Sequence, residues 1–390
     1  MNKRILFNMY NLEIGGAEKS LLSILNTIDY SRYNVDLFLY ENSGELINEL
    51  PEEVNLLSEI DTYKTLCEST KLTFKRGYIK LGIIRTISKY LSIIKKVPLA
   101  YDQYMNDLAN KILPNIDGEY DIAISNIWPH NLVTDKVKAK KKIGWIHTDY
   151  SKMRIDYKRD FKTLDKLDYI VSVSDNCKEI FDKIQPKLKY KSISLENIVS
   201  SKLIKELSEK KIDENTLFDN QDIKILTVAR LHSEKGVDRV VEVCKKLKDD
   251  GKKFKWYIVG FGYQENELKI RAKELGIGDN FYILGKKVNP YPYFKKCDIY
   301  VQPSRYEGKA VTVGEAQILG KPVVITNYTT AKSQVRDNVD GYICELSVEG
   351  IADGLEKLYK DKKLRIKLSN NCKNTDYGNS NELYKLYKLF

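Results

Sequence analysis

The sequence predicts an α/β protein built from two doubly wound parallel sheets. Its 390 residues exceed an ordinary single domain and suit two. Apolar runs of strand length alternate with amphipathic stretches along nearly the whole chain, which is typical of parallel sheets with helices on both faces. A charged stretch without strand pattern, residues 198–221, separates two such alternating halves.

The first half begins with a strand at Lys3–Met9, a glycine turn, and a helix over residues 17–28. Later apolar runs are each followed by a helical pattern, which indicates further strand–helix units. The predicted strands after the first are Val35–Tyr40, Asp121–Ser125, Ile143–His147 and Tyr169–Val173. We therefore expect an N-terminal domain over residues 1–200, interrupted by a basic insertion at 62–97.

The second half repeats this scheme more regularly. Its predicted strands are Ile223–Val228, Trp256–Val259, Phe281–Leu284, Ile299–Gln302 and Val323–Thr326, with helices at Val237–Asp249, Gln264–Leu275 and Lys309–Leu319. After a linker at 201–221 we expect a C-terminal domain at 222–375. The last segment, 376–390, is expected to form a helix that packs back on the first domain.

Composition excludes several classes of protein. Hydrophobic residues make up 42% of the chain, enough for real cores. Six cysteines without a Cys-x-x-Cys pair and only three histidines argue against a zinc site or a disulfide framework, and favour a reducing cytoplasm. No apolar run approaches the roughly 18 residues that a membrane span needs.

The net charge of +11 is concentrated in one stretch. Between Lys64 and Lys96 there are nine lysines and arginines against one acid, Glu68, interleaved with apolar residues. Three interpretations stay open: a solvated helical face packed on the N-terminal domain, a basic helix on an anionic membrane surface, and nucleic-acid binding. The first two are favoured, because no recognised nucleic-acid module accompanies the stretch.

Ligands of open parallel sheets bind outside the carboxyl ends of the strands, so residues that follow strands are the first candidates for a site. Arg230 and Lys235 follow the strand Ile223–Val228 and flank the start of a helix. Two cations at a helix N-terminus suit a diphosphate. Gly260 follows the next strand and is expected to let the backbone approach a ligand closely.

Two glutamates follow the strand Ile299–Gln302. Glu307 stands in the loop after this strand and Glu315 on the second turn of the next helix. Carboxylates accept hydrogen bonds from sugar hydroxyls and from a ribose diol. Gly308 keeps the loop free of a side chain, and backbone N–H groups at the helix start face a diphosphate.

These motifs resemble those of the retaining group 1 glycosyltransferases of the two-Rossmann (GT-B) type, in the branch that builds bacterial capsules and surface polysaccharides. The resemblance covers nearly the whole chain. Its motifs are the Glu-x7-Glu element with the following Glu-Ala…Leu-Gly-Lys-Pro-Val, and, in order, GGAEKS (15–20), WIHTD (145–149), SVSD (172–175), ENIV (196–199), the Arg230/Lys235 pair and DGY (340–342).

The resemblance implies a role for each matching residue. Glu315 would bind the ribose of the nucleotide and Glu307 the hydroxyls of the donor sugar. Arg230 and Lys235 would hold the diphosphate as its charge develops, and His147 would lie beside the transferred sugar. The remaining implied residues are Gly16, Gly260, Gly308, Lys309 and Ala310 on the donor side, and Gly15, Gly16 and Asp149 on the acceptor side, where Asp149 is alternatively a helix cap.

The implied reaction moves a hexose or N-acetylhexosamine, with a UDP-sugar favoured, to a hydroxyl of a lipid-linked or growing surface polysaccharide with retention of configuration. No cofactor and no metal are expected, since the nucleotide-sugar is a substrate and no Asp-x-Asp element occurs. The enzyme is expected to be cytoplasmic and peripheral on the inner face of the membrane. Lys309 and Ala310 depart from the commonest pattern, which leaves the donor open. A nucleotide-sugar epimerase or hydrolase, or a non-catalytic partner protein, remains as an alternative.

Overall fold

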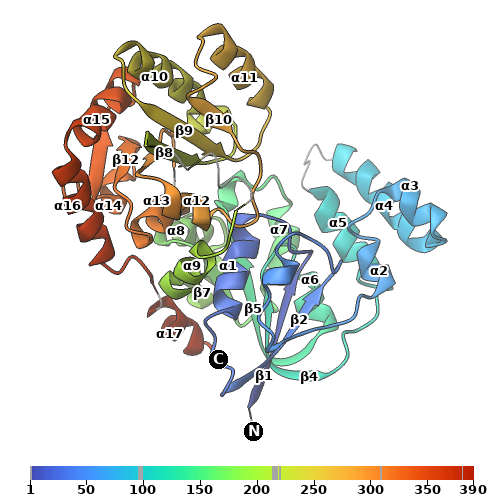
Figure 1. Cartoon of the computed structure of the whole chain (residues 1–390). Coiled ribbons are helices and arrows are strands. Elements are labelled where there is room, and N and C mark those ends of the chain that lie inside the picture. Colours follow the sequence, from blue (N-terminus) through green and yellow to red (C-terminus); the bar gives the residue numbers. More distant parts are fainter. Residues whose placement is uncertain (1, 95–99, 213–217, 219–220, 308–309, 380) are drawn as a thin grey trace. The chain divides into compact units, whose positions relative to one another are not determined.

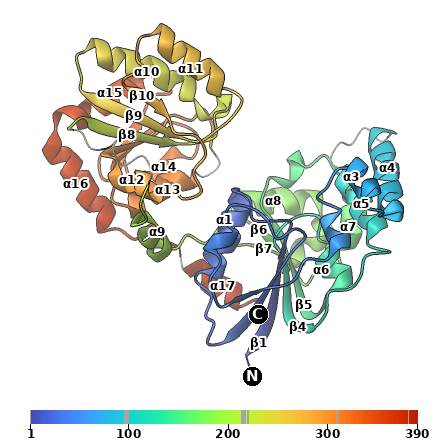
Figure 2. The same cartoon turned by 45° about the vertical axis from the view of Figure 1, so that its right-hand side comes forward.

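The chain divides into two units in the computed structural model, which describes residues 2–94, 100–212, 218, 221–307, 310–379 and 381–390. Unit 1 comprises Met1–Val199 and Asn379–Phe390, and unit 2 comprises Ser200–Gly378. Figures 1 and 2 show that each unit has its own sheet with helices packed around it. None of the described helices combines the length and apolar character that a membrane crossing requires.

Unit 1 contains a seven-stranded parallel sheet in the order β3-β2-β1-β4-β5-β6-β7. Its strands are β1 (Lys3–Met9), β2 (Tyr33–Leu39), β3 (Val54–Leu56), β4 (Glu119–Ser125), β5 (Lys138–Ile146), β6 (Tyr169–Ser172) and β7 (Ser192–Ser194). Its helices are α1 (Gly16–Leu25), α2 (Asp61–Lys64), α3 (Thr70–Lys75), α4 (Ile79–Ile94), α5 (Ala100–Ala109), α6 (Asn131–Lys136), α7 (Tyr157–Leu164), α8 (Asp175–Ile184) and α17 (Asn381–Tyr387).

Unit 2 contains a six-stranded parallel sheet in the order β10-β9-β8-β11-β12-β13. Its strands are β8 (Ile223–Val228), β9 (Phe254–Val259), β10 (Phe281–Ile283), β11 (Ile299–Gln302), β12 (Val323–Thr326) and β13 (Gly341–Cys344). Its helices are α9 (Ser201–Ser208), α10 (Val237–Asp249), α11 (Glu265–Glu274), α12 (Tyr291–Lys296), α13 (Val311–Ile318), α14 (Ala331–Gln334), α15 (Val348–Lys360) and α16 (Lys362–Lys373).

Both faces of the unit 2 sheet are buried, which explains its continuous apolar strands. Successive residues of a strand point to opposite faces. Ile225 and Trp256 therefore join one core, together with residues of α10 and α15, whereas Leu226 and Tyr257 join the other, together with residues of α12 and α13. A strand that is apolar on both faces forms because helices cover both of them.

The segments between and after the two domains differ in part from the expectation. Residues 201–221, expected as a linker, begin with α9, which packs against α12 in unit 2. The Asn289 side chain donates a hydrogen bond to the Leu207 carbonyl at the end of α9 (2.7 Å). The remaining linker residues lie mostly outside the described ranges.

The C-terminal segment returns to unit 1, while residues 376–378 stay with unit 2. Tyr387 of α17 stacks on Tyr33 of β2 and accepts a hydrogen bond from the backbone N–H of Asp29 (2.9 Å). The Lys3 ammonium donates to the Phe390 carbonyl (2.9 Å), which joins the two ends of the chain. A short helix that is marginal alone is thus fixed by tertiary contacts.

Candidate functional site

Each sheet reverses its strand order at one point, between β1 and β4 in unit 1 and between β8 and β11 in unit 2. Crossover connections leave in opposite directions there, which opens a crevice at the carboxyl ends of these strands. The residues that follow β8 and β11, and those at the ends of β1, β4 and β5, are therefore the parts of each unit best placed to meet a ligand.

Glu307 lies in the loop after β11 and is only 7% exposed. Both of its carboxylate oxygens accept hydrogen bonds from the Lys235 ammonium, at 2.8 and 2.9 Å. Oε1 also accepts bonds from the Ser304 hydroxyl (2.6 Å) and the Gln302 amide (3.1 Å). A buried carboxylate is costly unless it is paired and hydrogen-bonded, and these three side chains meet that need. The predicted diphosphate cation and the predicted sugar-binding carboxylate are therefore in direct contact.

Glu315 is buried within α13 and is held by a residue that sequence reasoning missed. The Tyr291 hydroxyl, at the start of α12, donates to Glu315 Oε1 (3.0 Å). Burial, and secondly the charge of Glu315, raise the pKa of Tyr291, so that the hydroxyl keeps its proton. Glu315 Oε2 is buried and has no hydrogen-bond partner among the described residues. This second oxygen is an acceptor that a ligand hydroxyl would satisfy.

Arg230 is the most accessible cation of the candidate site. Its side chain is 62% exposed, and its guanidinium lies 3.7 Å from the Glu234 carboxylate. The pKa of Glu234 is lowered, first by a hydrogen bond to its own backbone and then by the charges of His232, Arg230 and Lys235. Since Lys235 is paired with Glu307, Arg230 is better placed to receive an incoming anion.

Gly260, directly after β9, allows two loops of the backbone to lie close together. A Cβ on Gly260, whose φ is +154°, would lie 1.8 Å from the Ala229 carbonyl oxygen. Leu231 donates a backbone hydrogen bond to Phe261 (2.8 Å), so the two loops continue the pairing of their strands. Gly260 was expected to let a ligand approach, but its observed close neighbour is the adjacent loop.

Gly308 and Lys309 lie outside the described residues. Ala310 is the N-cap of α13, which begins at Val311 rather than at Lys309. The Gln334 side chain accepts a hydrogen bond from the Ala310 N–H (3.2 Å) and donates one to its carbonyl (3.1 Å). Ala310 thus fixes the start of the helix that carries Glu315.

In unit 1, His147 directly follows β5 and lies beside the parallel ring of Trp145. Burial lowers the pKa of His147 to about 4, although a hydrogen bond with the Asn126 backbone acts in the opposite direction. Nε2 is buried and has no partner among the described residues, which leaves Nδ1 for the interaction with the Asn126 backbone. At neutral pH the ring therefore offers Nε2 as a hydrogen-bond acceptor.

Further unpartnered polar atoms lie at the same edge of the unit 1 sheet. Strand register places Asn8 of β1 beside Ser125 of β4, and Ser172 of β6 beside Ile146 of β5. The buried side-chain atoms here that lack a partner among the described residues include Asn8 Nδ2, Asn126 Nδ2, Trp145 Nε1 and Ser172 Oγ. Sequence reasoning missed this polar edge, although an asparagine next to the end of a buried strand is a signal for it.

The acceptor-side residues have simple local surroundings. Gly15 is the N-cap of α1, and a Cβ on it would lie 2.1 Å from the Glu18 carboxylate, whereas Gly16 faces open space. Asp149 caps a short 3-10 helix by accepting the Ser151 N–H (2.9 Å), which is the alternative role considered for it. Within the described ranges, no group of three or more His, Cys, Asp and Glu side chains is arranged to hold a metal ion.

Known proteins share both the sequence pattern and the fold of this chain. Residues 208–375 match the family "Glycosyl transferases group 1". The chain is 25% identical over 387 residues to an uncharacterized glycosyltransferase of Haemophilus influenzae, covering 96% of each chain. It is 30% identical over 195 residues, about half of each chain, to a Campylobacter jejuni protein named as an N-acetylgalactosaminyltransferase acting on N-acetylgalactosamine-N,N'-diacetylbacillosaminyl-diphospho-undecaprenol.

Among solved structures, HepE of Anabaena in complex with UDP aligns with a TM-score of 0.62 at 13% identity, covering 99% of this chain and 98% of that one. A glycosyltransferase of Rickettsia africae aligns with a TM-score of 0.64 at 16% identity, covering 100% and 97%. These alignments and the two parallel sheets confirm the predicted fold of two Rossmann-like domains. Residues 208–375 of the chain thus match the group 1 glycosyl transferases, and the chain is similar to a glycosyltransferase over nearly its whole length.

Proposed function

We propose that this glycosyltransferase moves a hexose or N-acetylhexosamine from a UDP-sugar to a hydroxyl of a lipid-linked or growing surface polysaccharide, with retention of configuration. The observation that carries the donor part is the arrangement at the carboxyl edge of the unit 2 sheet. Glu315 presents a buried, unsatisfied oxygen there, and Glu307 lies in the loop after β11. Glu307 contacts Lys235, which follows the neighbouring strand β8, as does the accessible Arg230.

Each of these groups has a part in the proposed reaction. Glu315 Oε2 accepts a hydrogen bond from a ribose hydroxyl. The hydroxyls of the donor sugar hydrogen-bond to Glu307, in competition with the side chains that already contact its oxygens. The bond between the anomeric carbon and the diphosphate breaks with its electron pair on the diphosphate oxygen, whose growing charge Arg230 and Lys235 stabilise. The acceptor hydroxyl then attacks the anomeric carbon from the same face, and its proton passes to the departing diphosphate oxygen. Protein cations perform this neutralisation, so we expect transfer to proceed in the presence of a metal chelator.

Unit 1 supplies groups of the complementary kind. The neutral His147 ring accepts a sugar hydroxyl at Nε2, and the asparagine amides at the ends of β1 and β4 donate to sugar or acceptor oxygens. Support for the donor comes from HepE, whose crystals contain UDP. Support for a lipid-linked acceptor comes from the Campylobacter relative, which is named for a diphospho-undecaprenol substrate.

We further propose that α3 and α4 rest on an anionic membrane surface at the inner face of the cell membrane. Apolar side chains recur every three or four residues along α4 and are exposed: Ile79, Ile83, Ile87, Tyr90 and Ile94. Exposed lysines accompany them, including Lys75 and Lys80. A solvated helical face would be polar, so this face favours lipid. Two arginines of the basic stretch are not part of this exposed face: Arg85 is buried, and Arg76 is paired with Asp61 and Glu68.

The donor proposal is tested by calorimetry with UDP on Glu315→Gln and on a control, Glu267→Gln. Glu267 lies exposed on α11 of the same unit, so the control makes the same chemical change away from the site. A hydrogen bond to a charged group contributes about 1.5–3 kcal/mol, so E315Q should bind UDP roughly 10- to 100-fold more weakly. Equal affinity of E315Q and the unaltered chain, or no binding of any nucleoside diphosphate, would overturn the proposal.

A further inference from the structure

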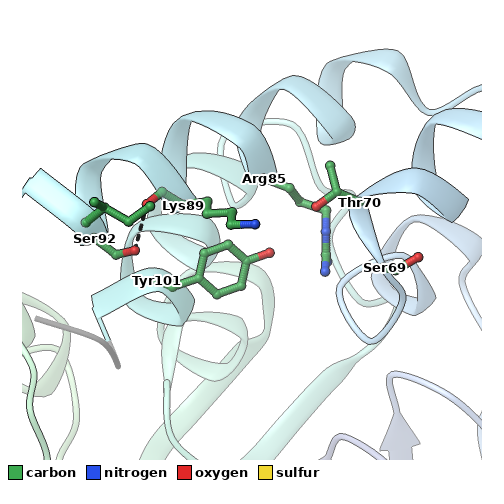
Figure 3. Close-up of a pocket in the computed structure, with 7 residues that line it drawn as sticks. Ser69, Thr70, Arg85, Lys89, Ser92 and Tyr101 are labelled. Carbon is green, nitrogen blue, oxygen red and sulfur yellow. Dashed lines mark hydrogen bonds between the residues drawn. The ribbon is translucent and has the colours of Figure 1, made fainter.

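A cavity of about 900 Å³ lies beneath α4 in unit 1, and none of its lining residues belongs to the candidate site described above. Residues of α4 line it together with the start of α3 and the start of α5 (Figure 3). The lining side chains are Ser69, Thr70, Arg85, Lys89, Ser92, Ile93 and Tyr101. They include two cations and four hydroxyl groups but no carboxylate, so the cavity is suited to an oxyanion.

Arg85 is the central charged group of this cavity and is only 6% exposed. Its guanidinium donates to the Thr65 carbonyl (2.8 Å), the Leu66 carbonyl (3.2 Å) and the Glu68 carbonyl. No carboxylate forms an ion pair with it in the described part of the chain, and its Nε is buried without a partner there. A buried cation without a direct ion pair is costly, and an anion in the cavity would supply one.

Two acids near the cavity are not among its lining side chains. Burial is the larger effect on Asp102 and raises its pKa, while the charge of Arg85 lowers the pKa. The Glu68 carboxylate is paired with Arg76. Lys89 adds a second cation to the lining, and Figure 3 shows its ammonium and the Arg85 guanidinium on either side of the Tyr101 hydroxyl.

The cavity adjoins the exposed apolar surface of α3 and α4. Ile93 lines the cavity and is also 64% exposed, next to the exposed Ile94. Gly82 of α4 brings α3 close, because a Cβ at this position would lie 2.6 Å from the Phe74 ring. Phe74 and Leu72, both partly exposed, therefore widen the apolar surface beside the cavity. A ligand with a charged end and an apolar tail fits this combination.

We propose that the cavity binds the terminal phosphate or diphosphate of a membrane lipid whose chains lie along the exposed apolar face of α4. The inference rests on the membrane contact proposed above and gives it a specific headgroup site. Arg85 and Lys89 neutralise the phosphate charge, while the hydroxyls of Thr70 and Tyr101 donate to its oxygens. The apolar tail passes over Ile93 into the bilayer.

The test measures binding of the full chain to two kinds of phosphatidylcholine vesicle. One contains phosphatidic acid, whose phosphate is terminal, and the other contains phosphatidylglycerol at a content that gives the same zeta potential. The unaltered chain should prefer the terminal phosphate about tenfold, the effect of one additional charge-assisted hydrogen bond. Lys89→Gln should abolish most of this preference.

Lys80→Gln is the matched control, because Lys80 is also exposed on α4 but does not line the cavity. It should weaken binding to both vesicles alike and keep the preference. Arg85→Gln should behave as K89Q does, provided that its thermal unfolding shows a folded protein. The proposal is overturned if the unaltered chain binds both vesicles equally, or if K89Q keeps the preference. It is also overturned if inorganic phosphate binds in a Lys89-dependent way without any vesicle preference.

Calorimetry with UDP on the same preparations separates this inference from the proposed function. Normal UDP binding together with an absent vesicle preference rejects only the lipid-phosphate site. Loss of binding to every anionic vesicle rejects the membrane contact as well, and absent UDP binding rejects the donor proposal independently of either result.

Discussion

At the scale of single residues, the direct contact between Lys235 and Glu307 has two consequences. Both side chains are largely buried, and Lys235 Nζ lies within 2.9 Å of both carboxylate oxygens. The pair therefore stabilises unit 2 before any substrate arrives. It also means that a donor must share or displace existing hydrogen bonds in order to reach either residue.

The energetic coupling of this pair can be measured with a double-mutant cycle. Lys235→Met leaves the Glu307 carboxylate buried with only the Ser304 and Gln302 donors, so we expect unfolding free energy to fall by about 2–4 kcal/mol. Glu307→Gln removes the same attraction. The double variant should lose less than the sum, with a coupling of about 1–3 kcal/mol, measured by urea unfolding. Additive losses would show that the contact contributes nothing to stability.

At the scale of elements, Gly236 positions the loop that carries Lys235 against the loop that carries Glu307. Its φ is +68°, and a Cβ there would lie 2.1 Å from the Pro303 carbonyl oxygen. Gly251 has nearly the same φ, +67°, but a Cβ on it would meet nothing within 4 Å. Alanine substitutions at these two glycines therefore distinguish two free-energy costs. At Gly251 only the left-handed backbone conformation is unfavourable, whereas at Gly236 the methyl group also clashes with Pro303.

We expect Gly251→Ala to lower unfolding free energy by about 1 kcal/mol and to leave UDP binding unchanged, because only backbone conformation is affected. Gly236→Ala should cost more than this, since the loop must also move away from Pro303, and that movement disturbs Lys235. Its affinity for UDP should therefore fall as well. Urea unfolding and calorimetry check both effects, and equal behaviour of the two variants would contradict this account of the loop.

Apolar runs predicted most strands of both sheets, because a strand with two buried faces is continuously apolar, but the short outer strands β3, β7 and β13 were not predicted. The first strand was predicted at Lys3–Met9, and the structure has it there. Other features depend on contacts that are distant in sequence. The Tyr291 bond to Glu315 spans 24 residues, and Gly260 meets Ala229 across two loops. Neither has a local signature, so the partners of the predicted site residues could not be predicted.

Which side of α4 is buried and which is exposed could also not be predicted from the sequence. The interleaved basic and apolar residues predicted a helix here, but such a pattern is expected whether the apolar side is buried or exposed. Only the packing of α4 on α3 and α5 shows that Ser88 and Ser92 face inward while Ile83 and Ile87 face outward. A charge count also could not show that Arg85 is buried and lines the cavity beneath α4 instead of standing on the exposed face of the helix.

At the scale of the whole molecule, unit 1 holds ionisable groups whose burial makes its stability depend on pH. Burial lowers the pKa of His130 to about 3 and that of His147 to about 4, from 6.5. Burial raises the pKa of Asp160 from 3.8 to about 6. All three groups lie in unit 1, so lowering the pH should change the stability of this unit through their protonation.

The signs of these three contributions differ. Below pH 6.5 the unfolded chain binds protons at both histidines while the folded chain does not, so stability falls as pH decreases. Asp160 acts in the opposite direction, because below pH 6 the folded chain binds its proton before the unfolded chain does. Two histidines outweigh one aspartate, and the net loss between pH 6.5 and about 4.5 should be about 3 kcal/mol.

The variant His130→Asn tests this balance. His130 is the clearest residue to change, because it is fully buried and its Nδ1 lies 2.8 Å from the Ser125 hydroxyl. Asparagine retains a polar group beside Ser125 but does not titrate. We expect the variant to be less stable near neutral pH. Its unfolding free energy should also depend less steeply on pH, because one of the two histidines that oppose Asp160 is gone while Asp160 remains. Urea unfolding of both proteins at several pH values between 4.5 and 7 measures the two slopes. An unchanged slope would mean that His130 is protonated equally in the folded and unfolded chain, which its complete burial does not allow.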